Sequence, residues 1–300
     1  MLNRRAFLKN TSLAACAGAL SGATLRTAAA QAGGALKKAV CIGVLPRDLP
    51  LAQRFEMAQK AGFEGIEPNT LRTSEEVQQY KEAAKSTGIK LHSIMNSDHW
   101  KFPLSDSNPE VVKQCVDGIK TSMQNAHEVG ADAVLLVPAV VTADVRYVEA
   151  YKRSQEQIHK LLPMAKELGV VIAIENVGNR FLLSPIEFTR YVEEFSSPYV
   201  KAYFDIGNIV SNGWPQDWIR TMGKQLMKVH IKRMEPGSDQ PKFDPADRRG
   251  QGINWPDVRR ALTEVGYTGW VTAEVKPGDE TYLRELSSRM DKFIAGENPS

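Results

Sequence analysis

The chain has 300 residues, of which 42 % are hydrophobic and 24 % are charged, the balance of an ordinary soluble globular protein. This composition excludes a disordered chain, a collagen-like chain and a disulfide-dense miniprotein, and the length is enough to bury a sizeable core. The net charge is +3, but residues 1–30 carry four basic residues and no acid, so the remainder carries −1. A nearly neutral body lacks the basic surface that nucleic acids select, and we expect no nucleic-acid partner.

The first 30 residues have the pattern of an export signal. Two adjacent arginines lie between Asn3 and Lys9, small and apolar residues follow, and three alanines end the segment at Ala30. This order is typical of a secretory signal, and the paired arginines resemble the twin-arginine type. We expect residues 1–30 to be removed and residues 31–300 to form the mature, periplasmic or otherwise exported domain. The alternative is a plain N-terminal helix. No membrane span is expected, because the apolar run is shorter than the roughly 20 residues required.

Eight short apolar runs, each followed by a helical pattern, fill the rest of the chain. Continuous Val, Ile, Leu and Ala are typical of strands buried on both faces. The predicted strands are residues 39–45, 64–68, 90–95, 133–137, 170–175, 201–205, 227–232 and 270–275.

Helix start and stop signals separate these runs. Asn108-Pro109 and Ser184-Pro185 open helices, and Gly88, Gly130 and Gly169 end them. Eight strand–helix units over about 250 residues predict a single-domain (β/α)₈ TIM barrel. An open doubly wound sheet is the alternative, but no G-x-G-x-x-G follows the first strand, where a nucleotide-binding fold would need it.

Four consecutive predicted strands offer side chains that bind metals. Glu175 ends the fifth strand and Asp205 the sixth, while His230 and Glu274 lie in the seventh and eighth. In a TIM barrel these ends meet at one rim, where the active site lies. A charged residue in an apolar strand is costly unless it is paired or bound to metal. Three carboxylates and a histidine suit one divalent ion, Mn²⁺, Mg²⁺, Co²⁺ or Zn²⁺. The alternative is a set of salt bridges without an ion.

Such a metal site favours chemistry next to a carbonyl group. The ion would chelate adjacent carbonyl and hydroxyl oxygens of a small sugar and polarise the carbonyl. The surplus negative charge of three carboxylates makes one of them basic enough to remove the alpha proton, which forms an enediolate. Return of the proton elsewhere isomerises or epimerises the sugar. Loss of a group from the beta carbon would instead make the protein a lyase or dehydratase of a keto-sugar or ketoglycoside.

The strand-end motifs resemble those of the sugar phosphate isomerase/epimerase superfamily, with its xylose isomerase-like TIM barrel. They are Glu175-Asn176, Asp205-Ile206-Gly207-Asn208, Val229-His230-Ile231-Lys232, residues 248–255 and Glu274. The resemblance implies that Glu175 and Glu274 are catalytic and also bind the metal, and that Asp205 and His230 complete the ligand set. The chain departs from ketose 3-epimerases of the superfamily at Asn208, where these often have histidine, and at residues 181–183, where they tend to carry another glutamate.

Several residues near the predicted rim are candidate substrate contacts. Arg248 is favoured by family position, Lys232 shares the side of its strand with His230, and Trp100 offers an apolar platform for a sugar face. The full set is Glu67, His99, Trp100, Asn208, Lys232 and Arg248. The alternatives are loop packing for His99 and Trp100, balance of the carboxylate charge for Lys232, and a hydrogen bond to a metal ligand for Asn208.

The expected substrate is an unphosphorylated sugar or keto-sugar. No phosphate-binding loop is present in the sequence, and phosphorylated sugars are mostly intracellular, whereas this chain is expected to be exported. Two rival functions are metal-dependent phosphodiester cleavage, as in apurinic-site endonucleases, and a non-catalytic sugar-binding barrel. The sequence leaves the oligomeric state open, a homo-oligomer included.

Overall fold

The computed structural model describes residues 36–237, 241, 243–244 and 252–299. These residues belong to one compact unit. The predicted export signal at residues 1–30 and the predicted substrate contact Arg248 both lie outside the described residues.

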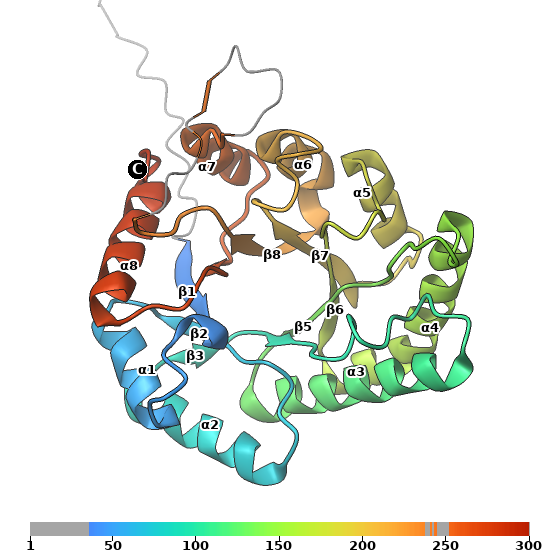
Figure 1. The fold of residues 1–300 in the computed structure, drawn as a ribbon, viewed down its shortest axis with the longest axis horizontal. Coiled ribbons are helices and arrows are strands. Elements are labelled where there is room, and N and C mark those ends of the chain that lie inside the picture. Colours follow the sequence, from blue (N-terminus) through green and yellow to red (C-terminus); the bar gives the residue numbers. More distant parts are fainter. Residues whose placement is uncertain (1–35, 238–240, 242, 245–251, 300) are drawn as a thin grey trace, which may run out of the picture. The chain divides into compact units, whose positions relative to one another are not determined.

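Nine parallel strands of the described chain form a nearly closed barrel with the helices outside it (Figure 1). The strands are β1 (Lys37–Cys41), β2 (Gly65–Glu67), β3 (Lys90–Leu91), β4 (Ile94–Met95), β5 (Ala133–Leu136), β6 (Val171–Glu175), β7 (Val200–Asp205), β8 (Leu226–Ile231) and β9 (Trp270–Ala273). Their order is β3-β2-β1-β9-β8-β7-β6-β5-β4. The predicted TIM barrel is confirmed.

Helices alternate with the strands along the described residues. They are α1 (Leu51–Lys60), α2 (Ser74–Thr87), α3 (Pro109–Val129), α4 (Tyr147–Leu168), α5 (Pro185–Glu193), α6 (Pro215–Met222), α7 (Trp255–Glu264) and α8 (Glu280–Ala295), with short 3₁₀ turns at Ile42–Val44 and Gly223–Gln225. Gly130 ends α3 at φ +77, a conformation that glycine adopts without strain and that turns the chain directly into β5. No helix among the described residues is long and apolar enough to cross a membrane.

The predicted third strand is interrupted at His92-Ser93 and therefore consists of β3 and β4. β3 pairs with β2, and β4 pairs with β5. The backbone at Met95 also bonds to the segment after β2, since Met95 N donates to Pro68 O at 2.8 Å. The interruption places two consecutive side chains among interior partners, because His92 contacts Thr272 and Ser93 contacts Glu67. The eight predicted strand positions hold, with one of them in two pieces.

Alternate residues of each strand face the barrel interior. A small cluster of Ala133, Leu135, Ala173 and Tyr203 fills part of this interior, whereas the intervening residues of β5 belong to the large core under the helices. This alternation is the period of two that a strand imposes on its side chains. The same period directs the polar strand-end side chains inward, toward the axis of the barrel.

Candidate metal centre and active site

The four side chains predicted as metal ligands come together at the C-terminal ends of adjacent strands. Glu175 and Asp205 end β6 and β7, His230 is the penultimate residue of β8, and Glu274 directly follows β9. Strand pairing sets Asp205 opposite His230, and Glu274 N donates to Ile231 O at 3.0 Å. As a result, one ligand atom from each of the four residues lies within 4.8 Å of the others. We call this group the rim cluster.

Each member of the rim cluster directs one buried atom toward the others without a hydrogen-bond partner. These atoms are Glu175 Oε1, Asp205 Oδ2, His230 Nδ1 and Glu274 Oε2. His230 Nδ1 lies 2.9 Å from Glu274 Oε2 and 3.4 Å from Glu175 Oε1. Buried polar atoms are normally hydrogen-bonded, so four such atoms that have ion pairs but no hydrogen bonds need an explanation. Three carboxylate oxygens and one imidazole nitrogen are a ligand set that fits a divalent ion.

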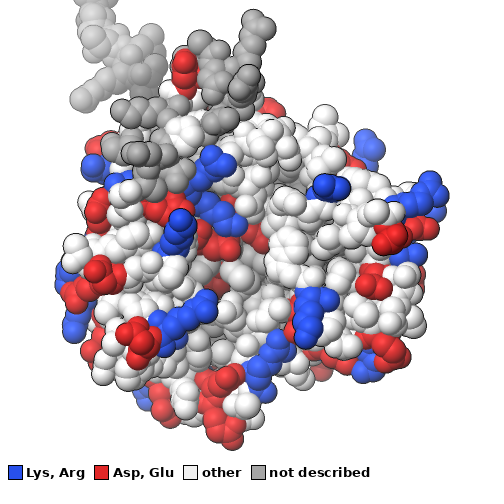
Figure 2. Space-filling model, viewed as in Figure 1, with Lys and Arg blue, Asp and Glu red and all other residues white. Residues whose placement is uncertain are grey.

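Lys232 lies beside the rim cluster. Its Nζ is 3.0 Å from Asp205 Oδ2, 3.2 Å from Glu274 Oε2 and 3.1 Å from Asn208 Oδ1. Burial disfavours the charged ammonium, but the neighbouring carboxylates outweigh this effect and raise the pKa of Lys232. The lysine therefore offsets part of the negative charge of the cluster. In Figure 2 acidic side chains gather near the centre of this face, with basic side chains beside them.

The two glutamates of the rim cluster differ in their affinity for protons. Burial raises the pKa of Glu175 to about 7. Burial acts in the same direction on Glu274, but His230 and Lys232 outweigh it and lower the pKa of Glu274 to about 2. The Glu274 side chain is also more exposed, at 31 % against 7 % for Glu175. Two carboxyl groups whose pKa values are driven apart are typical of an acid/base pair.

Asn176 and the loop after β7 fix the orientation of Asp205. Asn176 Nδ2 donates to Asp205 O at 2.8 Å, and Asp205 N donates to Asn176 Oδ1 at 2.7 Å. The other carboxylate oxygen, Asp205 Oδ1, accepts from the backbone N–H groups of Gly207 and Asn208 at 2.8 and 2.9 Å. These four bonds hold both the backbone and one oxygen of Asp205, so Oδ2 remains directed at the rim cluster.

His99 and Trp100 occupy the loop after β4. His99 is buried, and its Nδ1 accepts from Val137 N at 3.3 Å. The two rings meet edge to face at 5.8 Å, and Trp100 is 55 % exposed. His99 therefore ties the loop to the end of β5, while Trp100 presents its ring to solvent. A substrate contact by either residue stays a prediction, as it does for Asn208, Lys232 and Arg248.

Glu67 does not lie where a substrate contact requires it. Its side chain has no exposed surface, and Oε2 lies 2.6 Å from His230 Nε2, on the other side of the imidazole from the rim cluster. Oε1 accepts from Tyr203 Oη at 2.9 Å and from Ser93 Oγ. The predicted substrate contact by Glu67 is wrong, because β2 ends with this side chain enclosed inside the barrel.

The partners of Glu67 were not predicted from the sequence. Tyr203 lies two residues before Asp205 on β7, and a period of two places both side chains in the interior. That signal was available in the sequence for Tyr203. Cys41 and Ser93 come from the first and third strand positions, and no spacing in the sequence indicates that they meet Glu67.

The fold and the site together indicate the class of protein: a TIM barrel with metal-binding side chains at the C-terminal ends of its strands. Residues 55–292 match the family model described as "Xylose isomerase-like TIM barrel", and the chain belongs to this family.

Similar proteins include several sugar epimerases. L-ribulose-5-phosphate 3-epimerase UlaE of Escherichia coli O1:K1 / APEC is 23 % identical over 219 residues, which cover 67 % of this chain and 76 % of that protein. A D-tagatose 3-epimerase-like protein of known structure is 20 % identical, with a TM-score of 0.70 over 87 % of this chain and 97 % of the other. The apo 3-keto-D-glucoside 4-epimerase YcjR from E. coli is 17 % identical, with a TM-score of 0.71 over 87 % and 99 %. At these identities the solved structures show the likeness of the fold alone.

Proposed function

We propose that this chain is a divalent-metal-dependent sugar isomerase or epimerase that transfers a proton alpha to a carbonyl group. The observation that carries the proposal is the convergence in the rim cluster of four buried atoms of the types that bind metals, none of which has a hydrogen bond. The curated relative UlaE is a sugar 3-epimerase, which supports this class of reaction.

Glu175, Asp205, His230 and Glu274 would hold one ion, Mn²⁺, Mg²⁺, Co²⁺ or Zn²⁺. When bound, the ion supplies Lewis-acid polarisation of the substrate carbonyl. Asp205 and His230 act only as ligands, since Asn176 fixes the backbone of Asp205 and the imidazole of His230 is enclosed in the barrel.

Glu175 and Glu274 form the acid/base pair. Burial raises the pKa of Glu175, so it is the more basic carboxyl group of the pair and suits proton exchange with a substrate. Glu274 is ionised and partly exposed, so it can reach a substrate from the mouth of the barrel. The two come from β6 and from the end of β9, with β7 and β8 between them. The ionised member of the pair accepts the alpha proton, and the protonated member returns its proton to the resulting enediolate at a different position or face, so the two exchange protonation states.

The groups beside the rim cluster supply substrate contacts. Lys232 Nζ and the Asn208 side chain lie next to the ligands and can bind carbonyl or hydroxyl oxygens. Trp100 offers an exposed ring for the apolar face of a sugar, and His99 and Arg248 complete the proposed contacts. We assign an unphosphorylated sugar or keto-sugar as substrate, and export through the twin-arginine signal at residues 1–30.

The proposal is tested with the mature, metal-loaded protein on keto-sugars and aldose/ketose pairs. Glu175→Gln should lower turnover by about 10²–10⁴-fold, the usual contribution of a general acid or base. Glu82→Gln, an exposed glutamate of α2, is the matched control and should keep wild-type turnover. Equal rates in the wild type and in Glu175→Gln would refute the assigned function.

Product analysis by NMR in D₂O separates the reaction types. Solvent deuterium at the alpha carbon, without loss of a substituent, is the expected result for isomerisation or epimerisation. Loss of the group on the beta carbon would instead identify the lyase or dehydratase reaction, which shares the first proton removal.

A further inference from the structure

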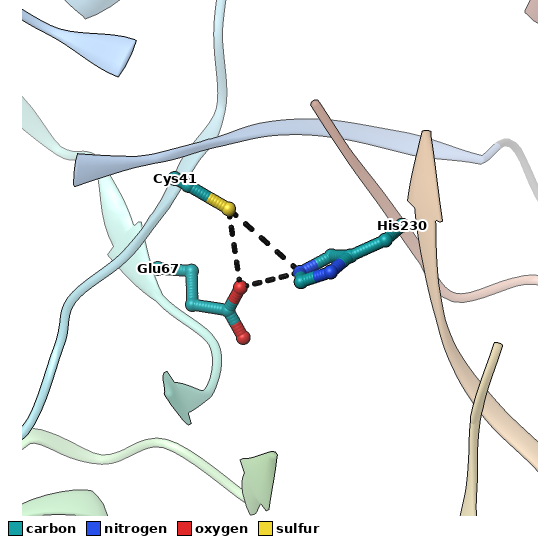
Figure 3. A group of neighbouring side chains, drawn as sticks. All are labelled: Cys41, Glu67 and His230. Atoms are coloured by element: carbon teal, nitrogen blue, oxygen red, sulfur yellow. Dashed lines mark hydrogen bonds and ion pairs between the residues drawn. The ribbon is translucent and has the colours of Figure 1, made fainter. Parts of the chain in front are cut away.

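A second group of polar side chains lies inside the barrel, on the far side of His230 from the rim cluster. It consists of Cys41 from β1, Glu67 from β2 and His230 from β8, and all three are buried. Figure 3 shows the thiol and the carboxylate both directed at the same edge of the imidazole ring. Glu67 Oε2 lies 2.6 Å from His230 Nε2 and 3.4 Å from Cys41 Sγ, and Sγ lies 3.7 Å from Nε2. The proposed proton transfer does not use Cys41 or Glu67.

Within the described part of the chain, each hydrogen-bond partner of the Glu67 carboxylate is a group that can donate. Oε1 is bonded to the hydroxyls of Tyr203 and Ser93, and Oε2 to the thiol of Cys41 and the ring of His230. An enclosed carboxylate surrounded only by donors is satisfied in its ionised form. An imidazole nitrogen 2.6 Å from an ionised carboxylate oxygen must carry the shared hydrogen, so Nε2 of His230 is protonated.

We propose that Glu67 is a positioning residue, which holds His230 with Nε2 as the hydrogen-bond donor and Nδ1 turned toward the rim cluster. The two ring nitrogens then have separate functions, since Nδ1 is the atom that lacks a hydrogen-bond partner among the proposed ligands. Histidines that bind metals commonly donate their other N–H to a carboxylate, which fixes the ring and strengthens the ligand. The inference rests on the proposed function, because it requires a metal at the rim cluster.

The group of Cys41, Glu67 and His230 differs from the rim cluster in that its atoms are hydrogen-bonded to one another. The distance of 2.6 Å between Glu67 Oε2 and His230 Nε2 has the length of a charge-assisted hydrogen bond. Cys41 Sγ donates to the same carboxylate oxygen at 3.4 Å. We therefore treat Cys41 as a donor to Glu67 and not as a ligand.

Cobalt binding tests the role of Glu67 without any measurement of turnover. Co²⁺ affinity, measured by competition with a chelator, should fall about 10–100-fold in Glu67→Gln, the usual effect of losing such a partner. The visible absorption bands of the bound Co²⁺ should also change, because the imidazole is no longer held in one orientation. Cys41→Ala is the matched control from the same group, and its affinity, spectrum and single equivalent of Co²⁺ should equal those of the wild type.

The position of the His230 proton gives a second readout. In the zinc-loaded wild type, ¹⁵N-edited NMR should show a proton on Nε2 and none on Nδ1, with the resonances identified by their loss in His230→Asn. A proton on Nδ1 in the zinc-loaded protein would overturn the inference.

The outcomes separate this inference from the proposed function. A wild type that binds no Co²⁺ refutes the proposed function itself. A wild type that binds Co²⁺, together with a Glu67→Gln variant of equal affinity and spectrum, refutes only the role of Glu67. A second equivalent of Co²⁺ that is lost in Cys41→Ala would make Cys41, Glu67 and His230 a metal site. That result would also overturn the positioning role of Glu67. If Glu67→Gln does not fold by circular dichroism, Glu67→Asp takes its place. That variant draws the carboxylate away from His230 Nε2 and should weaken Co²⁺ binding, and unchanged affinity and spectrum there refute the role of Glu67.

Discussion

The side chain of Asn176 joins the end of β6 to the backbone of β7 and offers a sharp test of how the rim is built. Its amide accepts from Asp205 N at 2.7 Å and donates to Asp205 O at 2.8 Å. Asn176→Ala removes both bonds at once. We expect a lower free energy of unfolding and a weaker metal site, because Asp205 loses the contacts that fix its backbone.

The size of the effect follows from the burial of these bonds. Asn176 is only 3 % exposed, so water does not readily replace its amide. A buried backbone group left without its partner costs about 1–3 kcal/mol, so the loss of two such partners should lower the free energy of unfolding by about 2–6 kcal/mol.

Urea denaturation in EDTA measures this loss without a contribution from metal binding. Asn212→Ala, an exposed asparagine after β7, is the matched control and should change stability by less than about 0.5 kcal/mol. A loss of less than about 0.5 kcal/mol in Asn176→Ala would refute the reasoning, since it would mean that the two bonds carry no net stability.

Three further predictions concern the metal, the loop after β4 and the turn after β7. Divalent metal at 100 times its Kd should stabilise the wild type against unfolding by about 2.7 kcal/mol relative to EDTA, and equal stabilisation of Asp205→Ala would contradict the ligand role. Trp100→Ala should raise KM and leave stability within about 0.5 kcal/mol, because the ring is 55 % exposed, and an unchanged KM would remove Trp100 from the substrate site. Gly207→Ala should lower turnover, because the added Cβ would lie 2.6 Å from Lys232 Cβ, whereas Gly178→Ala meets nothing within 4 Å and should match the wild type. Equal turnover in the two glycine variants would show that the close approach of Lys232 to Gly207 is not needed for turnover.

The fold and the rim cluster were predictable because each depends on local patterns along the chain. Alternating apolar runs and helix signals define the strand–helix units, and parallel strands bring their C-terminal ends to one rim whatever their details. Glu175 and Asp205 end their strands in the structure as in the prediction. Glu274 lies one residue beyond β9 and still reaches the cluster, so the convergence does not depend on the exact strand boundary.

The contacts among Cys41, Glu67 and His230 depend on how far each strand is shifted along the barrel relative to its neighbours. Local sequence patterns do not encode this shift. β2 pairs with β1 so that Glu67 lies opposite Cys41, whereas on the other side of the barrel Asp205 lies opposite His230. The stagger between neighbouring strands decides which strand-end residue reaches the rim and which remains inside. Glu67 has the same position in its strand as Glu175, yet it is enclosed in the barrel.

The interruption of the third strand has a similar origin. His92 and Ser93 are consecutive, and a regular strand would turn them to opposite faces. Their interior partners, Thr272 and Glu67, lie far away in the sequence. Only the assembled barrel brings these partners together, so the apolar run at residues 90–95 predicts one continuous strand.

Anomalous diffraction from crystals of the protein grown with Mn²⁺ tests most directly whether the rim cluster holds an ion. We expect one anomalous peak, with Glu175 Oε1, Asp205 Oδ2, His230 Nδ1 and Glu274 Oε2 about 2.0–2.3 Å from it. A rim cluster without a peak, or an ion held by other residues, would contradict the metal site and the proposed reaction with it.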